Sequence, residues 1–165
     1  MQRNYVPQTF KVTTWDLLKP FYDELLKRSL SSETELEKWL LDISELSSVV
    51  SEDMAWRYIK MTCDTTDEAI RNSFNDFVNN IEPNIAPIAN DLNKKLIDCP
   101  FAKNLPKEKY FVYIRGVEKS ILLFREINIP LKTELQTKEQ EFGAINGKQT
   151  ITYNGEEMTL QKAGV

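Results

Sequence analysis

The longest regular pattern in this chain is a run of apolar residues between positions 67 and 97. Consecutive members of the run are three or four residues apart, which places them on one face of an α-helix. They are Ile70, Phe74, Phe77, Ile81, Ile85, Ile88, Leu92 and Leu96. Pro83 and Pro87 lie inside the run, and each lacks the amide donor that a helix uses. Because the apolar phase continues across both prolines, we expect one long helix over residues 67–97 with a bend near Glu82.

A second long helix is predicted before it, over residues 33–63. Its apolar positions keep helical spacing, and no proline or glycine interrupts them. Ser32 and Glu35 form an S-x-x-E capping box at its start. Thr65 or Thr66 is the expected N-cap of the helix that follows. Since a short turn joins the two long helices, they should pack antiparallel as a helical hairpin.

Shorter elements are expected on both sides of this helical hairpin. Residues 1–13 are expected to be extended and residues 14–18 to form a turn, with Pro20 in the first turn of a short helix. The Ile129-Pro130 step marks a boundary or a kink between two later helices. The shorter helices are predicted over residues 20–27, 107–127 and 131–145.

The pattern changes to a period of two near the C-terminus, over residues 149–160. The dipeptide Asn154-Gly155 lies in its middle and favours a two-residue β-hairpin turn. This turn pairs Tyr153 with Glu156 and Ile151 with Met158. The apolar face then consists of Ile151, Met158 and Leu160. A two-stranded ribbon is marginally stable alone in water, so this face is expected to pack on something.

Together these elements predict an all-α fold of long antiparallel helices, including a proline-bent one, with a C-terminal β-hairpin. The 165 residues are enough for one domain over residues 1–165, and 41% apolar with 28% charged residues is ordinary for a globular protein. No apolar run approaches the ~20 residues that span a bilayer, and residues 1–10 lack the apolar stretch of a secretory signal. We therefore expect a cytoplasmic protein without a membrane partner. The net charge of −4 offers no positive field for a phosphate backbone, which argues against nucleic acid as a partner.

Histidine is absent from the chain. This removes the commonest general base and the commonest zinc ligand. The two cysteines, Cys63 and Cys99, form no CxxC pair and are expected to be reduced thiols. Cys63 has no histidine to activate it as a nucleophile. We therefore predict no catalytic, cofactor-binding or metal-ligating residue in this chain.

Two further groups of side chains have both a structural and a functional interpretation. The aromatic residues could stack a ligand, but aromatic residues at helical spacing are far more often part of the core. The charged residues could bind a ligand, but a solvated face and surface ion pairs are favoured for them. The aromatic group is Trp39, Trp56, Phe74 and Phe77, and the charged group is Glu52, Asp53, Arg57 and Arg71.

Four blocks of the chain resemble, in the same order, blocks of the oligoendopeptidase F-like zinc metallopeptidases, which are relatives of thimet oligopeptidase. The blocks are SEDMAWRYIKMTCDTTDEAI, FVNNIEPNIAPIANDLNKKLIDCPF, EKYFVYIRGVEKSILLFREINIPLKTELQT and GAINGKQTITYNGEEMTLQKAG. The resemblance covers the chain from about Tyr5 to Val165. It implies the helical N-terminal part of a much longer peptidase, in which a helical shell encloses a channel where oligopeptides are cut.

That family binds zinc through an HExxH helix and a downstream glutamate, and the glutamate of the HExxH helix activates the metal-bound water. None of these residues can be placed on this chain, because it has no histidine. The resemblance therefore implies a fragment that forms part of the channel wall, with the zinc and the catalytic half beyond Val165. Oligopeptide substrates would be partners through that missing half, and the hairpin could mediate self-association. The alternative is a freestanding helical module that binds a partner helix or peptide in a groove.

Overall fold

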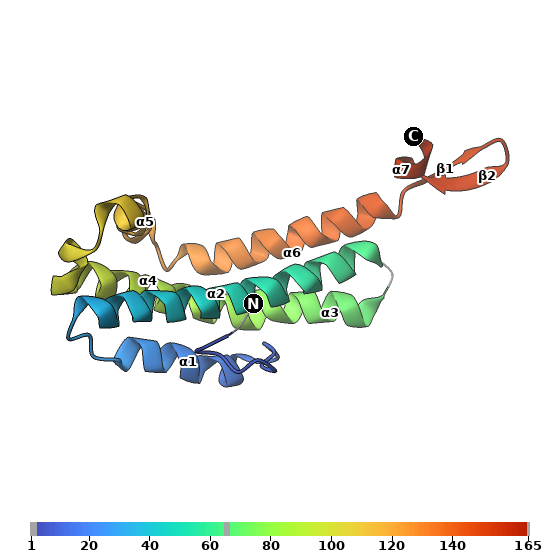
Figure 1. Ribbon diagram of the computed structural model, residues 1–165. Coiled ribbons are helices and arrows are strands. Elements are labelled where there is room, and N and C mark those ends of the chain that lie inside the picture. Colours follow the sequence, from blue (N-terminus) through green and yellow to red (C-terminus); the bar gives the residue numbers. More distant parts are fainter. Residues whose placement is uncertain (1–2, 65–66, 165) are drawn as a thin grey trace.

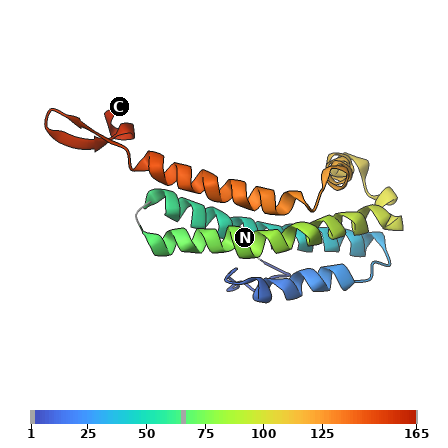
Figure 2. The ribbon, with the colours of Figure 1, turned by 180° about the vertical axis from the view of Figure 1, so that it is seen from behind.

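The computed structural model describes residues 3–64 and 67–164 and confirms a mostly helical fold with a small C-terminal hairpin. Two long helical runs lie antiparallel at the centre, α1 lies along one side of them and α6 along the other (Figures 1 and 2). In chain order the elements are α1 (Trp15–Lys27), α2 (Glu33–Cys63), α3 (Glu68–Asp76), the π-helical segment η1 (Phe77–Ile81), α4 (Glu82–Asp98), the 3-10 segment η2 (Pro100–Asn104), α5 (Lys107–Leu123), α6 (Asn128–Gly147), β1 (Thr150–Tyr153), β2 (Glu156–Thr159) and α7 (Leu160–Ala163).

The second long helix, α2, has the predicted bounds of residues 33–63. The Ser32 hydroxyl accepts a hydrogen bond from the Glu35 backbone N–H at 3.2 Å, as the capping box requires. The Glu35 carboxylate in turn accepts from the backbone N–H of Ser31 at 2.7 Å. One of the amides that lack partners in the first turn of the helix is thus satisfied, together with the amide of Ser31 directly before the N-cap.

The predicted long helix over residues 67–97 is confirmed as one helical run from α3 through η1 to α4. Glu82 is helical (φ −57°, ψ −43°), so no extended break separates the two halves. Its backbone N–H donates to the carbonyl of Phe77, five residues back, which is the π-helical pattern. The irregularity lies directly before Pro83, where the regular ladder must lose a donor. The run is capped by Asp67, and the predicted caps Thr65 and Thr66 lie outside the described residues.

The predicted bounds of the shorter helices are wrong at several ends. α1 begins at Trp15 instead of residue 20, because Pro20 removes only one bond of the helix while Leu18 and Tyr22 are buried on its inner face. α5 ends at Leu123 instead of residue 127, because Phe124 is extended. α6 runs over residues 128–147 instead of 131–145, since Pro130 falls in its first turn, where amides have no helical partner.

The hydrophobic core lies between α1, α2, the run from η1 to α4, and α5. Trp39, Leu18, Leu25, Leu36 and Ile81 are its most deeply buried large side chains. The extended N-terminal arm completes it, because Val6 and Val12 are buried there as well. A smaller cluster of Met61, Phe74 and Val78 lies where α2 packs against α3 and η1.

The C-terminal hairpin has the predicted register, with Ile151 opposite Met158 and Tyr153 opposite Glu156. Asn154 and Gly155 both have positive φ, 52° and 82°, as a type I′ turn requires. The strands contact each other and α7, and they project from the far end of α6 (Figure 1). On the predicted apolar face, Ile151 is 39% exposed and Leu160 44% exposed, while Met158 is partly buried, so the expected packing covers this face only in part.

Among the helices of the described residues, none is both long enough and apolar enough to span a bilayer.

Candidate functional site

The predicted aromatic group is mostly structural. Trp39 is fully buried, and its Nε1 donates to the carbonyl of Leu25 at 2.9 Å, near the end of α1. Phe74 and Phe77 are buried as well, while Trp56 is exposed on α2. These positions confirm the core interpretation for three of the four residues.

Arg57 is a structural residue that joins three segments. Its guanidinium donates to Asp53 at 2.7 Å, to the carbonyl of Ser73 at 2.6 Å and to the carbonyl of Val12 at 2.7 Å. It also lies over the ring of Phe77, 5.5 Å from the centroid. The predicted ion pair therefore exists, but it is partly buried, and Arg57 also fixes the N-terminal arm against α2 and α3.

The end of α1 is held by charged groups that sequence reasoning did not single out. The Lys95 ammonium donates to the carbonyls of Leu25, Leu26 and Arg28 at 2.6–2.8 Å. Burial lowers the pKa of Lys95 from its ordinary value. A cation at a helix C-terminus satisfies the last carbonyls and the helix dipole, so this contact stabilises the fold.

The outer face of α6 is the largest unusual feature of the structure. The helix has no buried residue, and its partly buried positions are Ile129, Thr133, Gln136, Thr137, Gln140 and Ala144. Apart from Ile129, its large apolar side chains are instead exposed to 57–70%, and at 100° per residue they fall on the opposite face. We call them the apolar ridge, and they are Leu131, Leu135, Phe142 and Ile145. On α6 these four apolar side chains lie on the face turned away from the body, and the exposed Lys138 lies among them at the same helical spacing.

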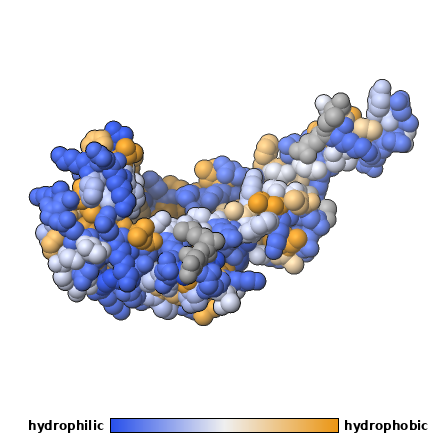
Figure 3. Space-filling model, in the orientation of Figure 1, coloured by the Kyte–Doolittle hydropathy of each residue, from blue (hydrophilic) through white to orange (hydrophobic). Residues whose placement is uncertain are grey.

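The apolar ridge continues onto neighbouring segments. Leu122, Leu123 and Ile127 at the α5–α6 junction are 70–75% exposed. In the space-filling view, hydrophobic side chains reach the surface over α5 and near the base of the hairpin (Figure 3). A soluble monomer rarely leaves so many large apolar side chains uncovered, so this surface has the character of an interface.

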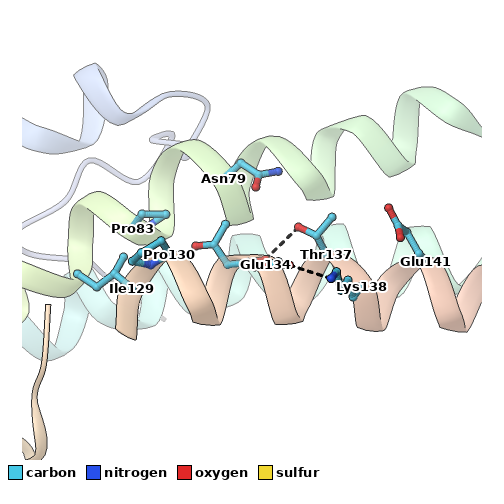
Figure 4. Close-up of a pocket in the computed structure, with 9 residues that line it drawn as sticks. Asn79, Pro83, Ile129, Pro130, Glu134, Thr137, Lys138 and Glu141 are labelled. Carbon is cyan, nitrogen blue, oxygen red and sulfur yellow. Dashed lines mark hydrogen bonds and ion pairs between the residues drawn. The ribbon is translucent and has the colours of Figure 1, made fainter. Parts of the chain in front are cut away.

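Polar contacts hold the inner face of α6 against the body. The Glu82 carboxylate accepts from Lys132 Nζ at 2.7 Å and from Gln136 Nε2 at 3.1 Å. Beside this contact is a shallow hollow of about 520 Å³. Figure 4 shows it between Asn79 and Pro83 on one side and the first turns of α6 on the other. Two of its three charged side chains, Lys138 and Glu134, are 2.8 Å apart and pair with each other, and Glu141 is the third.

A second cleft lies farther along α6, between its second half and the paired ends of α2 and α3. Its volume is about 580 Å³, and Arg71 of α3 lines it with Tyr58 and Met61 of α2 and Gly143 of α6. Arg71 is partly buried. Among the described residues it has no side-chain hydrogen bond and no ion pair, so the surface ion pair predicted for it is wrong. Glu52 and Asp53 lie outside this cleft and pair with Arg3 at 3.7 Å and with Arg57.

The cysteines cannot join in a disulfide or a metal site. Cys63 ends α2, whereas Cys99 follows α4 at the opposite end of the antiparallel pair, and α2 alone is about 45 Å long. Both thiols are free, with Cys63 exposed and Cys99 buried. In the part of the chain that the structure describes, no three side chains of the ligating types cluster as a metal site would require.

Comparison with known proteins gives one result. The family model of the Peptidase M3 N-terminal domain matches residues 6–124. The match ends where α5 ends, and it contains every buried residue of the main core. No curated protein and no solved structure matches the chain.

Proposed function

Because the chain belongs to the Peptidase M3 N-terminal domain family, we propose that it is the helical N-terminal part of a zinc-dependent oligoendopeptidase and contributes to the wall of its substrate channel. The family match over residues 6–124 is the observation that carries the proposal. It agrees with the resemblance of four sequence blocks to oligoendopeptidase F-like enzymes.

The residues of this chain do not fit a zinc site. Histidine is absent, and the two cysteines lie at opposite ends of the helical pair. In the proposed enzyme, zinc is therefore bound through residues outside this sequence, and this chain supplies none of the zinc ligands. The free thiols agree with a reducing compartment, and we place the enzyme in the cytoplasm as part of the same proposal.

The outward apolar ridge supports a docking role for α6. Burying its side chains would stabilise an interface by roughly 25 cal/mol per Å² of apolar area. The ridge follows the matched region directly along the chain. We propose that the apolar ridge contacts the catalytic part of the enzyme, while the helices of residues 15–123 form the body that supports α6.

The proposal is tested with the coding sequence and with a peptidase assay. The reading frame should continue past Val165 and encode an HExxH helix. The full product should cleave a fluorescence-quenched oligopeptide, lose this activity with a zinc chelator, and recover it with zinc. The 165-residue chain alone should bind no stoichiometric zinc and cleave nothing. A stop codon directly after Val165 would favour the freestanding interaction module instead.

The role of the ridge is tested in the full product with Leu135→Ser. Loss of the docking contact should lower the unfolding temperature or kcat/KM, because the apolar contact positions one domain against the other. Leu41→Ser is the matched control, since Leu41 is 62% exposed against 57% for Leu135 but belongs to α2 and not to the ridge. Equal effects of the two substitutions would argue against docking through α6.

A further inference from the structure

The cleft between α6 and the ends of α2 and α3 contains a cation that the fold does not use. Arg28 and Arg57 both bind carboxylates at 2.5–2.8 Å, whereas the Arg71 guanidinium has no acceptor among the described residues. Arg71 is nevertheless partly buried, so it is not freely hydrated on all sides. A planar guanidinium in this situation is suited to bidentate pairing with a carboxylate.

The cleft beside Arg71 has an apolar floor. Phe74 is buried there, and the ring of Tyr58 lies 6.1 Å from its centroid at an angle of 52°. Met54 and Met61 complete this floor with flexible side chains. An apolar side chain of a ligand could therefore pack on the exposed ring of Tyr58, which Phe74 supports from below, while a charged group reaches Arg71.

The opposite wall of the cleft leaves room for such a ligand. A Cβ atom built at Gly143 of α6 would meet no other atom within 4 Å. The volume of about 580 Å³ lies in the range of sites for small ligands. Glu139 also lines the cleft, so its negative charge disfavours a ligand with a second acidic group.

We infer that this cleft binds the C-terminal end of an oligopeptide, with the terminal carboxylate on Arg71 and an apolar last side chain on the floor of Tyr58 and Phe74. Glu139 favours a basic or neutral residue before it. The inference rests on the proposed function, because an oligopeptidase is what makes oligopeptides the available ligand. It goes further by assigning one end of the peptide to a defined place on the N-terminal helices.

The test is a titration of the ¹⁵N-labelled 165-residue chain with two peptides, Ala-Ala-Lys-Phe as the free acid and as the C-terminal amide. The acid should shift the amide signals of residues around Arg71 and Phe74. The amide form should bind at least about tenfold more weakly, because it loses a charge-assisted pair. Equal binding of the two peptides, or no shifts near the cleft, would overturn the inference.

Two variants and a control make the test specific. Arg71→Gln should abolish the preference for the free acid, and Gly143→Leu should block the cleft while leaving Arg71 in place. Lys60→Gln removes a charge of the same sign from the last turn of α2, close to Arg71 of α3 along the chain, but Lys60 does not line the cleft, so this variant should retain the preference. If Arg71→Gln still binds the free acid more tightly than the amide, another group of the chain binds the terminal carboxylate. The titration measures binding without catalysis. A negative peptidase assay would therefore contradict the proposed function without contradicting the binding of the peptide carboxylate at Arg71.

Discussion

The carboxylate of Glu45 accepts a hydrogen bond of 2.7 Å from the backbone N–H of Val6, which lies 39 residues earlier in the chain. The same carboxylate accepts from the N–H groups of Tyr5 at 2.9 Å and Asn4 at 2.8 Å. Three successive amides of the N-terminal arm thus converge on one buried side chain of α2. This contact holds Val6 in the core, although residues 3–14 of the arm form no helix or strand.

Replacing Glu45 with glutamine should destabilise the fold by about 1–3 kcal/mol. A glutamine offers one acceptor oxygen, and its NH₂ group would face backbone donors that need an acceptor. Urea unfolding followed by circular dichroism measures the change. Glu118→Gln on α5 removes the same charge from an exposed position and should change stability by less than about 0.5 kcal/mol. Similar values for the two variants would show that the three contacts contribute little.

Acid should weaken the fold through the same residue. Burial alone would raise the pKa of Glu45, but the N–H donors of Val6, Asn4 and Tyr5 bring the net pKa below its ordinary value of 4.5. Because the pKa of Glu45 is lower in the folded state than in the unfolded state, its contribution to the free energy of unfolding is fully present above the unfolded-state pKa. That contribution is lost as pH falls through the folded pKa. The urea midpoint of the wild type should therefore drop more steeply below about pH 4.5 than that of Glu45→Gln. If the urea midpoints of the two proteins fall in parallel as the pH is lowered, Glu45 does not contribute to the loss of stability in acid.

Asp67→Ala should destabilise the chain by about 1 kcal/mol. The Asp67 Oδ1 atom accepts from the N–H groups of Ala69 at 2.8 Å and Ile70 at 3.1 Å, and the substitution leaves both amides without this partner. Thermal unfolding monitored at 222 nm detects the loss. Asp67→Asn keeps an oxygen in the capping position and should recover most of the stability. If alanine and asparagine behave alike, the helix start does not depend on this cap.

The 165-residue chain should self-associate through its hairpin in solution. The apolar face of Ile151 and Tyr153 is open, and each strand has one edge without a neighbouring strand. Sedimentation velocity over a range of concentrations should show association that weakens in the double variant Ile151→Ser, Met158→Ser. Thr152→Ser on the other face of β1 is the control. A chain that stays monomeric at every concentration would refute this expectation.

The long elements could be predicted from the sequence because their signals are local and repeated. Leu36, Trp39 and Leu40 begin an apolar series that continues through α2, and Ser32 with Glu35 marks its start. The type I′ turn follows from Asn154 and Gly155 alone, since few other residues accept positive φ at both positions. In these cases local preference and final structure agree.

The direction in which a helix faces could not be predicted in the same way. The apolar spacing of Leu131, Leu135 and Phe142 indicates a helix, but it does not say whether the apolar side meets its own domain. The signal that could have shown this is the composition of the other face, where Thr133, Gln136, Thr137 and Gln140 offer little to a core. The role of Arg57 depended on Val12, 45 residues away, and no local pattern contains that information.

The turn between Leu123 and Asn128 separates two parts of the chain that leave the ribosome one after the other, the body first and α6 second. All buried members of the main core lie between Val6 and Val117, so the body can close as soon as α5 has left the ribosomal exit tunnel. α6 emerges next with its apolar face outward, and nothing made before it covers that face. At this stage the nascent chain carries a finished domain followed by an exposed hydrophobic helix, which is the kind of segment that chaperones bind. A translational pause after α6 would prolong that exposure, whereas a pause before Asn128 would leave only the closed body outside the tunnel.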